Sequence, residues 1–271
     1  MPHPLVWNIT EKSPNDLWIS TAAGIARFDV SNSSPIPKQI PKRLQDVTAV
    51  RDLVFDGEST LWIATTSQGL LKYDFLKESI TNYSVKYHLS TECVDLALDT
   101  FGKLWIGSYN GFYLLDKEDY LQRINDSLQS NYTMDVNIIG DSVFISHSGG
   151  VVVRSVSHPF EKPRVLVADV TDSLQLPFSI TSAVAFAQGK YWVGMYDRGI
   201  ARVGKNLKVE KLYTEDQGLS GHVIESILVD KDERVWVATN QGLSMIDPKT
   251  DEVLSWKKKN GLRSGEFGLG S

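Results

Sequence analysis

The fold is decided by a stretch that reads Val235-Trp236-Val237-Ala238-Thr239-Asn240-Gln241-Gly242-Leu243-Ser244-Met245-Ile246-Asp247. Its pattern is an aliphatic residue, an aromatic one, another aliphatic one, two small or polar residues, and then a Gly followed five residues later by a slot that is usually Asp. The pattern recurs along the chain, with its aromatic at Trp18, Trp62, Trp105, Phe144, Trp192 and Trp236 and its Gly at Gly24, Gly69, Gly111, Gly150, Gly199 and Gly242. Successive aromatics are 44, 43, 39, 48 and 44 residues apart. That spacing is the period of a four-stranded propeller blade.

Each repeat can be interpreted as four short strands separated by turns. In the sixth repeat, residues 223–230, 234–239, 242–247 and 252–256 are apolar runs bounded by turn residues. We expect the Trp to fill the space between packed blades and the Gly to need a positive φ where one strand turns into the next. Three acids, Asp56, Asp99 and Asp230, stand six residues before their Trp and are expected to accept hydrogen bonds from turn amides.

The sequence therefore predicts an all-β propeller of four-stranded blades in a single domain. The blades are expected at about 5–44, 45–87, 88–132, 133–176, 177–219 and 220–260. Because Asn260-Gly261-Leu262 repeats Gln217-Gly218-Leu219, we expect a further blade to start at 261–271. The chain is then a fragment of a longer protein and part of a seven-bladed propeller, with six-bladed closure as the alternative.

Bulk composition excludes several classes of function. The net charge of -5 and the lack of a basic stripe argue against binding to nucleic acid. The single cysteine, Cys93, excludes an internal disulfide and a paired-thiol metal site. No apolar run approaches the ~20 residues of a membrane helix, and the N-terminal residues lack the layout of a signal peptide.

The repeat closely resembles the two-component regulator propeller repeat. The resemblance rests on Gln217-Gly218-Leu219 followed by the strands at 223–230 and 235–247, and it extends over essentially the whole chain, most weakly in the fourth repeat. It implies the periplasmic sensory region of a hybrid two-component histidine kinase, whose membrane helix and kinase lie outside this chain. The implied ligand is a small molecule such as an oligosaccharide, and the implied full-length receptor is a homodimer.

Catalytic and metal-binding patterns are not evident. No Gly-x-Ser-x-Gly elbow occurs, and the five His residues are scattered without metal-ligand spacing. The repeated carboxylates occupy turn slots, so no catalytic pair stands out. We therefore expect no cofactor, no metal and no catalytic residue, while calcium in an acidic channel, as in sugar-lactone hydrolase propellers, stays open.

Candidate ligand contacts follow from propeller geometry. The loop between the second and third strands opens on the same face as the loop that joins two blades, and loops on a rigid scaffold tend to carry binding. Aromatic rings, amides and one Arg in those loops suit a sugar or an acidic sugar. The predicted contacts are Tyr109, Asn110, His147, Tyr196, Asp197, Arg198, Asn240 and Gln241.

Three functions remain open on these grounds. The favoured one is a non-catalytic sensor propeller that passes its ligand state to a kinase. The alternatives are a propeller enzyme, such as a lyase or a lactone hydrolase with a channel metal, and a scaffold that binds another protein.

Overall fold

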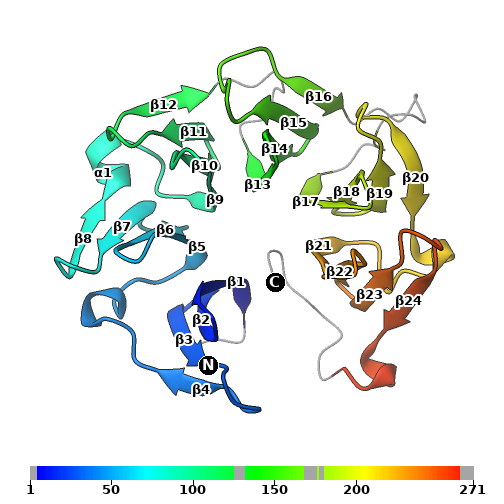
Figure 1. The fold of residues 1–271 in the computed structure, drawn as a ribbon, viewed down its shortest axis with the longest axis horizontal. Coiled ribbons are helices and arrows are strands. Elements are labelled where there is room, and N and C mark those ends of the chain that lie inside the picture. The colour runs from blue at the N-terminus through cyan, green and yellow to red at the C-terminus, as the bar shows by residue number, and fades with distance from the viewer. Residues whose placement is uncertain (1–4, 125–131, 168–175, 177–179, 263–271) are drawn as a thin grey trace. The chain divides into compact units, whose positions relative to one another are not determined.

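The computed structural model of the chain describes residues 5–124, 132–167, 176 and 180–262. These residues form six antiparallel sheets of four strands each (Figure 1). In every sheet the four strands follow one another in chain order, and each pairs with the next. We call each sheet a blade and number the blades in chain order. The prediction of an all-β protein built from four-stranded blades is confirmed.

The chain divides after Ile124 into two compact units, and the first holds blades one to three. Blade one is β1 (Val6–Ser13), β2 (Asp16–Thr21), β3 (Gly24–Asp29) and β4 (Ile36–Lys38), followed by the 3-10 helix η1 (Lys42–Leu44). Blade two is β5 (Val50–Asp56), β6 (Thr60–Thr65), β7 (Leu70–Asp74) and β8 (Ser79–Asn82), followed by α1 (Tyr83–Tyr87). Blade three is β9 (Cys93–Leu98), β10 (Leu104–Ser108), β11 (Gly111–Leu115) and β12 (Leu121–Ile124).

The second unit holds blades four to six. Blade four is β13 (Thr133–Ile139), β14 (Ser142–His147), β15 (Gly150–Ser155) and β16 (Arg164–Val167). Blade five is β17 (Thr181–Ala187), β18 (Lys190–Met195), β19 (Gly199–Val203) and β20 (Val209–Tyr213), followed by η2 (Glu215–Gln217). Blade six is β21 (Ile224–Val229), β22 (Val235–Thr239), β23 (Gly242–Ile246) and β24 (Val253–Trp256), followed by η3 (Lys258–Asn260). None of the helices in the described part of the chain is long and apolar enough to cross a bilayer.

The first strands of consecutive blades lie side by side within each unit, in the orders β1-β5-β9 and β13-β17-β21. Each of these strands has an extra, unpaired residue between the first two residues that pair with the second strand of its blade. Such a β-bulge bends a strand and redirects its side chains. The bulge is therefore a repeated feature of the blade, which the sequence pattern did not reveal.

The motif aromatic packs against the next blade, as predicted. Trp18 is fully buried and makes edge contacts with Phe55 and Phe75 of blade two, at ring-centroid distances of 5.4 and 6.0 Å. Trp192 is fully buried in a cluster that includes Ile224 and Val237 of blade six. Truncating a core ring of this size typically costs about 3–5 kcal/mol. The repeated Trp thus contributes to the packing between successive blades within a unit.

Two of the three acids that stand six residues before a Trp, Asp99 and Asp230, bind more than turn amides. Asp56 does not, since the indole N–H of Trp62 has no partner among the described residues. Asp99 accepts the indole N–H of Trp105 at 2.9 Å and the backbone N–H groups of Phe101 and Lys103. Asp230 does the same for Trp236, whose Nε1 donates at 2.8 Å. This pairing satisfies the one polar atom of a buried ring, so it fixes the orientation of the Trp as well as the turn.

The repeated Gly has a positive φ in all six blades, from 75° at Gly69 to 154° at Gly242. At Gly242 an added Cβ would also stand only 2.2 Å from the backbone oxygen of Trp256. Both the backbone conformation and the close approach of the next strand therefore require Gly here.

The prediction of a seven-bladed propeller is wrong, because the described residues form six four-stranded blades. Its main support was the recurrence of Gly218-Leu219 as Gly261-Leu262. Both glycines follow a short 3-10 helix and have a left-handed φ, 102° and 98°. The pattern therefore marks the turn that ends a blade. Residues 263–271, where the further blade was expected to continue, lie outside the described residues.

Candidate ligand site

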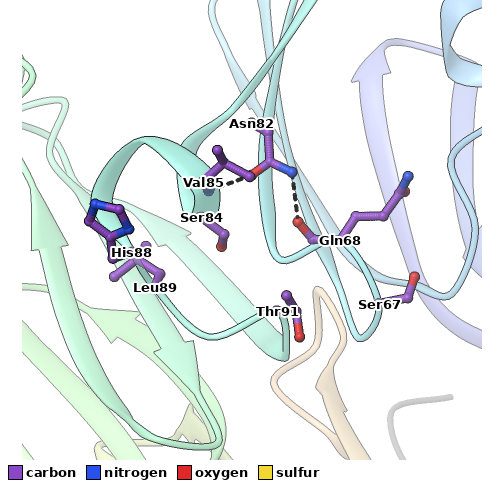
Figure 2. Close-up of a pocket in the computed structure, with 8 residues that line it drawn as sticks. All are labelled: Ser67, Gln68, Asn82, Ser84, Val85, His88, Leu89 and Thr91. Atoms are coloured by element: carbon purple, nitrogen blue, oxygen red, sulfur yellow. Dashed lines mark hydrogen bonds between the residues drawn. The ribbon is translucent and has the colours of Figure 1, made fainter.

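A hollow of about 680 Å³ lies between the β6–β7 turn and α1. The β6–β7 turn joins the second and third strands of blade two, and α1 begins the connection from blade two to blade three. Figure 2 shows the side chains around it, with Ser67 and Gln68 at one end and the helix residues at the other. Its lining consists of Ser67, Gln68, Asn82, Ser84, Val85, His88, Leu89 and Thr91.

Asn82 holds the two walls of the pocket together. Its Oδ1 accepts the backbone N–H of Val85 at 2.9 Å, which makes it the N-cap of α1. Its Nδ2 donates to the backbone oxygen of Gln68 at 3.1 Å, so the same amide fixes the β6–β7 turn. Both contacts are drawn in Figure 2.

Ser84 forms the base of this arrangement. It is 3% exposed, and its hydroxyl accepts the N–H of Leu70 and donates to the backbone oxygen of Ser90, each at 2.9 Å. Gly69 lies against it so closely that an added Cβ would approach Ser84 Oγ to 2.0 Å. The turn and the helix can come together only because residue 69 lacks a side chain.

The far side of α1 is anchored to blade three. Lys86 forms an ion pair with Asp119, and the Tyr87 hydroxyl donates to the backbone oxygen of the same residue. Tyr83 packs edge-on against Trp62 at 4.9 Å, and burial raises the pKa of the Tyr83 hydroxyl. A helix of five residues is not stable alone, so these contacts hold the helical wall of the pocket in place.

The pocket lining contains no carboxylate, Lys or Arg, and more of its exposed surface is apolar than polar. Ser67 and Thr91 contribute hydroxyls, which both donate and accept hydrogen bonds. The amide of Asn82 is already bonded to Val85 and Gln68. Val85 and Leu89 add apolar surface, and the imidazole of His88 completes the helical wall.

Of the eight contacts predicted from the sequence, none lines this pocket. They lie at the equivalent turns of blades three to six, as the geometry of the repeat predicted. Tyr109 and Asn110 form the β10–β11 turn, where Asn110 accepts hydrogen bonds from Ser108 and Arg123. Tyr196 is 39% exposed, and Asp197 and Arg198 beside it are exposed.

The remaining predicted contacts differ in exposure. Gln241 is exposed and donates to Glu215 at 3.4 Å, whereas Asn240 is half-buried. His147 is fully buried, because it is the last residue of β14 and occupies the slot that is Thr21 or Thr239 in other blades. There Thr181 of the next blade binds both its N–H and its backbone oxygen. The role of all eight residues in binding stays a prediction.

The sequence did carry a signal for the pocket. Ser67 and Gln68 occupy, in the second repeat, the same slot that was used for prediction in the later repeats. Asn82 followed by Tyr83-Ser84-Val85 resembles a helix start, which would have set this connection apart. No group of three or more His, Cys, Asp or Glu side chains within the described ranges could hold a metal ion.

Comparison with known proteins finds one family model that matches part of the chain. Residues 218–241, from the end of the blade-five connection through β22, match the family model described as two component regulator propeller. The match covers β21 and β22 of the sixth blade. This confirms the resemblance inferred from the same residues. No curated protein matches the chain.

Solved structures share the fold of this chain. One is the extracellular domain assigned to a hybrid two component system of B. thetaiotaomicron, with a TM-score of 0.75 and 15% identity over 97% of this chain and 35% of that one. A second such domain from the same organism has a TM-score of 0.68 and 19% identity over 96% and 42%. Virginiamycin B lyase from Staphylococcus aureus, solved with quinupristin, has a TM-score of 0.73 and 11% identity over 97% and 87%.

At these identities the similarity shows a shared fold and does not transfer an activity. The chain spans about a third of the first of these extracellular domains and less than half of the second. Blades of this kind therefore occur both in larger extracellular domains and in an enzyme.

Proposed function

We propose that this chain is a ligand-sensing propeller from the extracytoplasmic region of a hybrid two-component receptor. The regulator propeller repeat and the fold shared with two extracellular domains support this role. The chain itself is non-catalytic in this proposal, and its location is the periplasm. The kinase, the membrane segment and the homodimer contacts belong to other parts of the receptor.

The ligand class follows from the pocket beside α1. Its lining, which has the hydroxyls of Ser67 and Thr91 beside apolar surface and is free of carboxylates and of Lys and Arg, favours a neutral carbohydrate over an acidic one. The uncharged lining also provides no electrostatic attraction for an anion. This single observation supports a small carbohydrate ligand, because hydroxyl groups can satisfy many neutral donors and acceptors at once.

Calorimetric titration of the purified chain with neutral oligosaccharides tests this function. Maltotriose, xylotriose, mannotriose and arabinotriose are the probes, and trigalacturonic acid is the anionic comparison. We expect at least one neutral trisaccharide to bind and the anionic one to bind more weakly. Absence of binding by every saccharide would contradict the carbohydrate assignment.

A lyase is the second candidate, because the fold matches virginiamycin B lyase over 87% of that enzyme. Incubation of the chain with quinupristin and a divalent cation, followed by mass spectrometry, decides between the two. The sensor proposal predicts unchanged quinupristin, whereas conversion to a product would establish the enzyme instead.

A further inference from the structure

The first strands of blades one to three carry a polar side chain at the same position. Asn8, Asp52 and Asp95 each stand directly after the unpaired bulge residue of β1, β5 and β9. Because these three strands lie side by side, the three side chains form one row across the first unit. In the second unit the same position of β17 holds Ala183, which cannot continue such a row.

Asp52 is the centre of this row and binds both of the neighbouring first strands. Its side chain is buried, with 2% of the residue exposed. Its Oδ1 accepts hydrogen bonds from Nδ2 of Asn8 and from the N–H of Leu53, the latter at 2.7 Å. Its Oδ2 accepts the N–H of Leu96 in β9 at 2.9 Å. One carboxyl group therefore connects the first strands of three blades.

The Asp52 carboxyl is also hydrogen-bonded to the carboxyl of Asp95. Two carboxyl groups can share a hydrogen bond only when one of them carries a proton, because a carboxylate is an acceptor alone. Two adjacent negative charges out of water repel each other, so such a pair keeps one proton to a higher pH than an isolated Asp does. Burial also raises the pKa of the Asp52 carboxyl. The two groups therefore titrate as a pair.

The strands packed against β5 are β1, β2, β6 and β9, and Asp95 is the titratable group on them that hydrogen-bonds Asp52. The other titratable and charged side chains of these strands and of β5 are exposed or contact other groups; they are Glu11, Lys12, Asp16, Arg51, Asp56 and Cys93. Within the described ranges, no Lys or Arg pairs with Asp52. A proton is therefore what neutralises the second charge.

We propose that Asp52 and Asp95 share one proton and that this proton holds the first strands of blades one to three together, as a pH-responsive junction. While the proton is present, the bond between the two carboxyls joins β5 to β9, and Asn8 extends the connection to β1. Loss of the proton leaves two carboxylates that repel each other between blades two and three. A raised folded-state pKa stabilises the fold fully below the ordinary value of 3.8, and this contribution is lost as the pH rises through the folded-state value. The first unit is therefore more stable in mild acid than in alkali.

Asp95→Asn tests the shared proton, because its amide donates to Asp52 at every pH. This variant and its reference both carry Glu225→Gln, which removes the other carboxyl whose pKa burial raises. Asp46→Asn in the same background is the control for the loss of one negative charge, because Asp46 is exposed in the same unit. Each protein is melted by differential scanning calorimetry at pH 5.5 and pH 9. The carbon-13 shifts of the Asp carboxyls are followed by NMR over the same range.

We expect Asp95→Asn to melt within about 1 °C of its reference at pH 5.5 and about 2–4 °C above it at pH 9, with Asp46→Asn within about 1 °C of the reference at both. The reference should show an Asp carboxyl that titrates above about pH 6, and Asp95→Asn should lack it. If every Asp carboxyl of the reference titrates below about pH 5, the shared proton is overturned, and this result holds even if Asp95→Asn fails to fold. An effect of Asp95→Asn that is equal at the two pH values would overturn the role of the proton in holding the strands.

Discussion

At the scale of single residues, Gly69 determines whether the pocket can form. Its φ of 75° and its contact with Ser84 leave no room for a Cβ. We predict that Gly69→Ala lowers the free energy of unfolding by about 1–3 kcal/mol and abolishes binding of the trisaccharide. Urea denaturation and calorimetric titration measure the two effects. Gly140→Ala is the control, because Gly140 also has a positive φ but an added Cβ meets nothing within 4 Å. Equal effects of the two substitutions would show that backbone conformation alone matters.

Glu225 predicts a pH dependence of stability. It is 7% exposed at the bulge of β21, and burial raises its pKa to about 7 from an ordinary value of 4.5. A raised folded-state pKa stabilises the fold fully below pH 4.5, and this contribution is lost as the pH rises through 7. We therefore expect the unchanged chain to lose about 2 kcal/mol between pH 5 and pH 8 relative to Glu225→Gln. Denaturation curves of the two proteins at both pH values measure this, and parallel behaviour would refute it.

The roles of some single residues could be predicted from the sequence, and those of others could not. The roles of Trp18 and Gly242 were predictable because each repeats at a fixed spacing and has one physical use. The burial of His147 was not, since its loop slot follows from the repeat but its exposure depends on Thr181 of the next blade. His88 was noted only as a scattered histidine. Its place beside the hollow next to α1 appears only in the structure.

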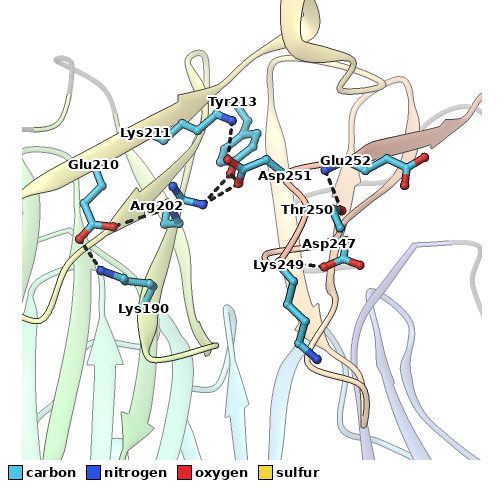
Figure 3. A network of polar contacts seen from close by, with 10 residues as sticks. All are labelled: Lys190, Arg202, Glu210, Lys211, Tyr213, Asp247, Lys249, Thr250, Asp251 and Glu252. Carbon is cyan, nitrogen blue, oxygen red and sulfur yellow. Dashed lines mark hydrogen bonds and ion pairs between the residues drawn. The ribbon is translucent and has the colours of Figure 1, made fainter.

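At the scale of elements, a polar network joins blades five and six (Figure 3). Asp251, in the β23–β24 turn, binds Arg202 Nη1 at 2.6 Å, Lys211 Nζ at 2.9 Å and the Tyr213 hydroxyl at 2.5 Å. The hydrogen bond from Tyr213, together with the two cations, lowers the pKa of Asp251 to about 2. The network therefore depends on an ionised Asp251.

This network predicts an acid-sensitive contact between the two blades. A lowered pKa stabilises the fold above the ordinary value of 3.8, and the contribution is lost as the pH falls toward 2. Because the Asp251 side chain is 36% exposed, solvent screening reduces its contribution to about 1 kcal/mol. Asp251→Asn, which tolerates the same φ of 61°, should lose this amount at pH 7 and little at pH 2.5. Denaturation at the two pH values measures it, and a deficit independent of pH would contradict the charge-based explanation.

The elements were predictable to different degrees. Alternating apolar residues and turn signals predicted four-stranded blades at the observed period. The helix α1 was missed because its five residues replace a turn and interrupt no repeat slot. The further blade was expected wrongly because the turn signature that ends a blade was interpreted as evidence that another blade follows. Short connecting elements depend on tertiary contacts, such as the one between Lys86 and Asp119, that no local pattern reveals.

At the scale of the whole molecule, the residues that build the blades differ from the residues proposed to contact a ligand. The repeated Trp, Gly and Asp build six similar blades, so they cannot by themselves distinguish one ligand from another. The pocket arises where one connection departs from the repeat, with α1 in place of a 3-10 helix and His88 in place of Gly. Ligand specificity in this propeller is therefore expected to lie in its irregular connections.

The central claim is that a neutral sugar binds between α1 and the β6–β7 turn. A crystal structure of the chain with its tightest-binding trisaccharide tests it most directly. We predict a sugar ring in the hollow between α1 and the β6–β7 turn, with ring hydroxyls within hydrogen-bonding distance of residues that line it. A sugar bound instead at Tyr196, Asp197 and Arg198, with the pocket beside α1 empty, would contradict it.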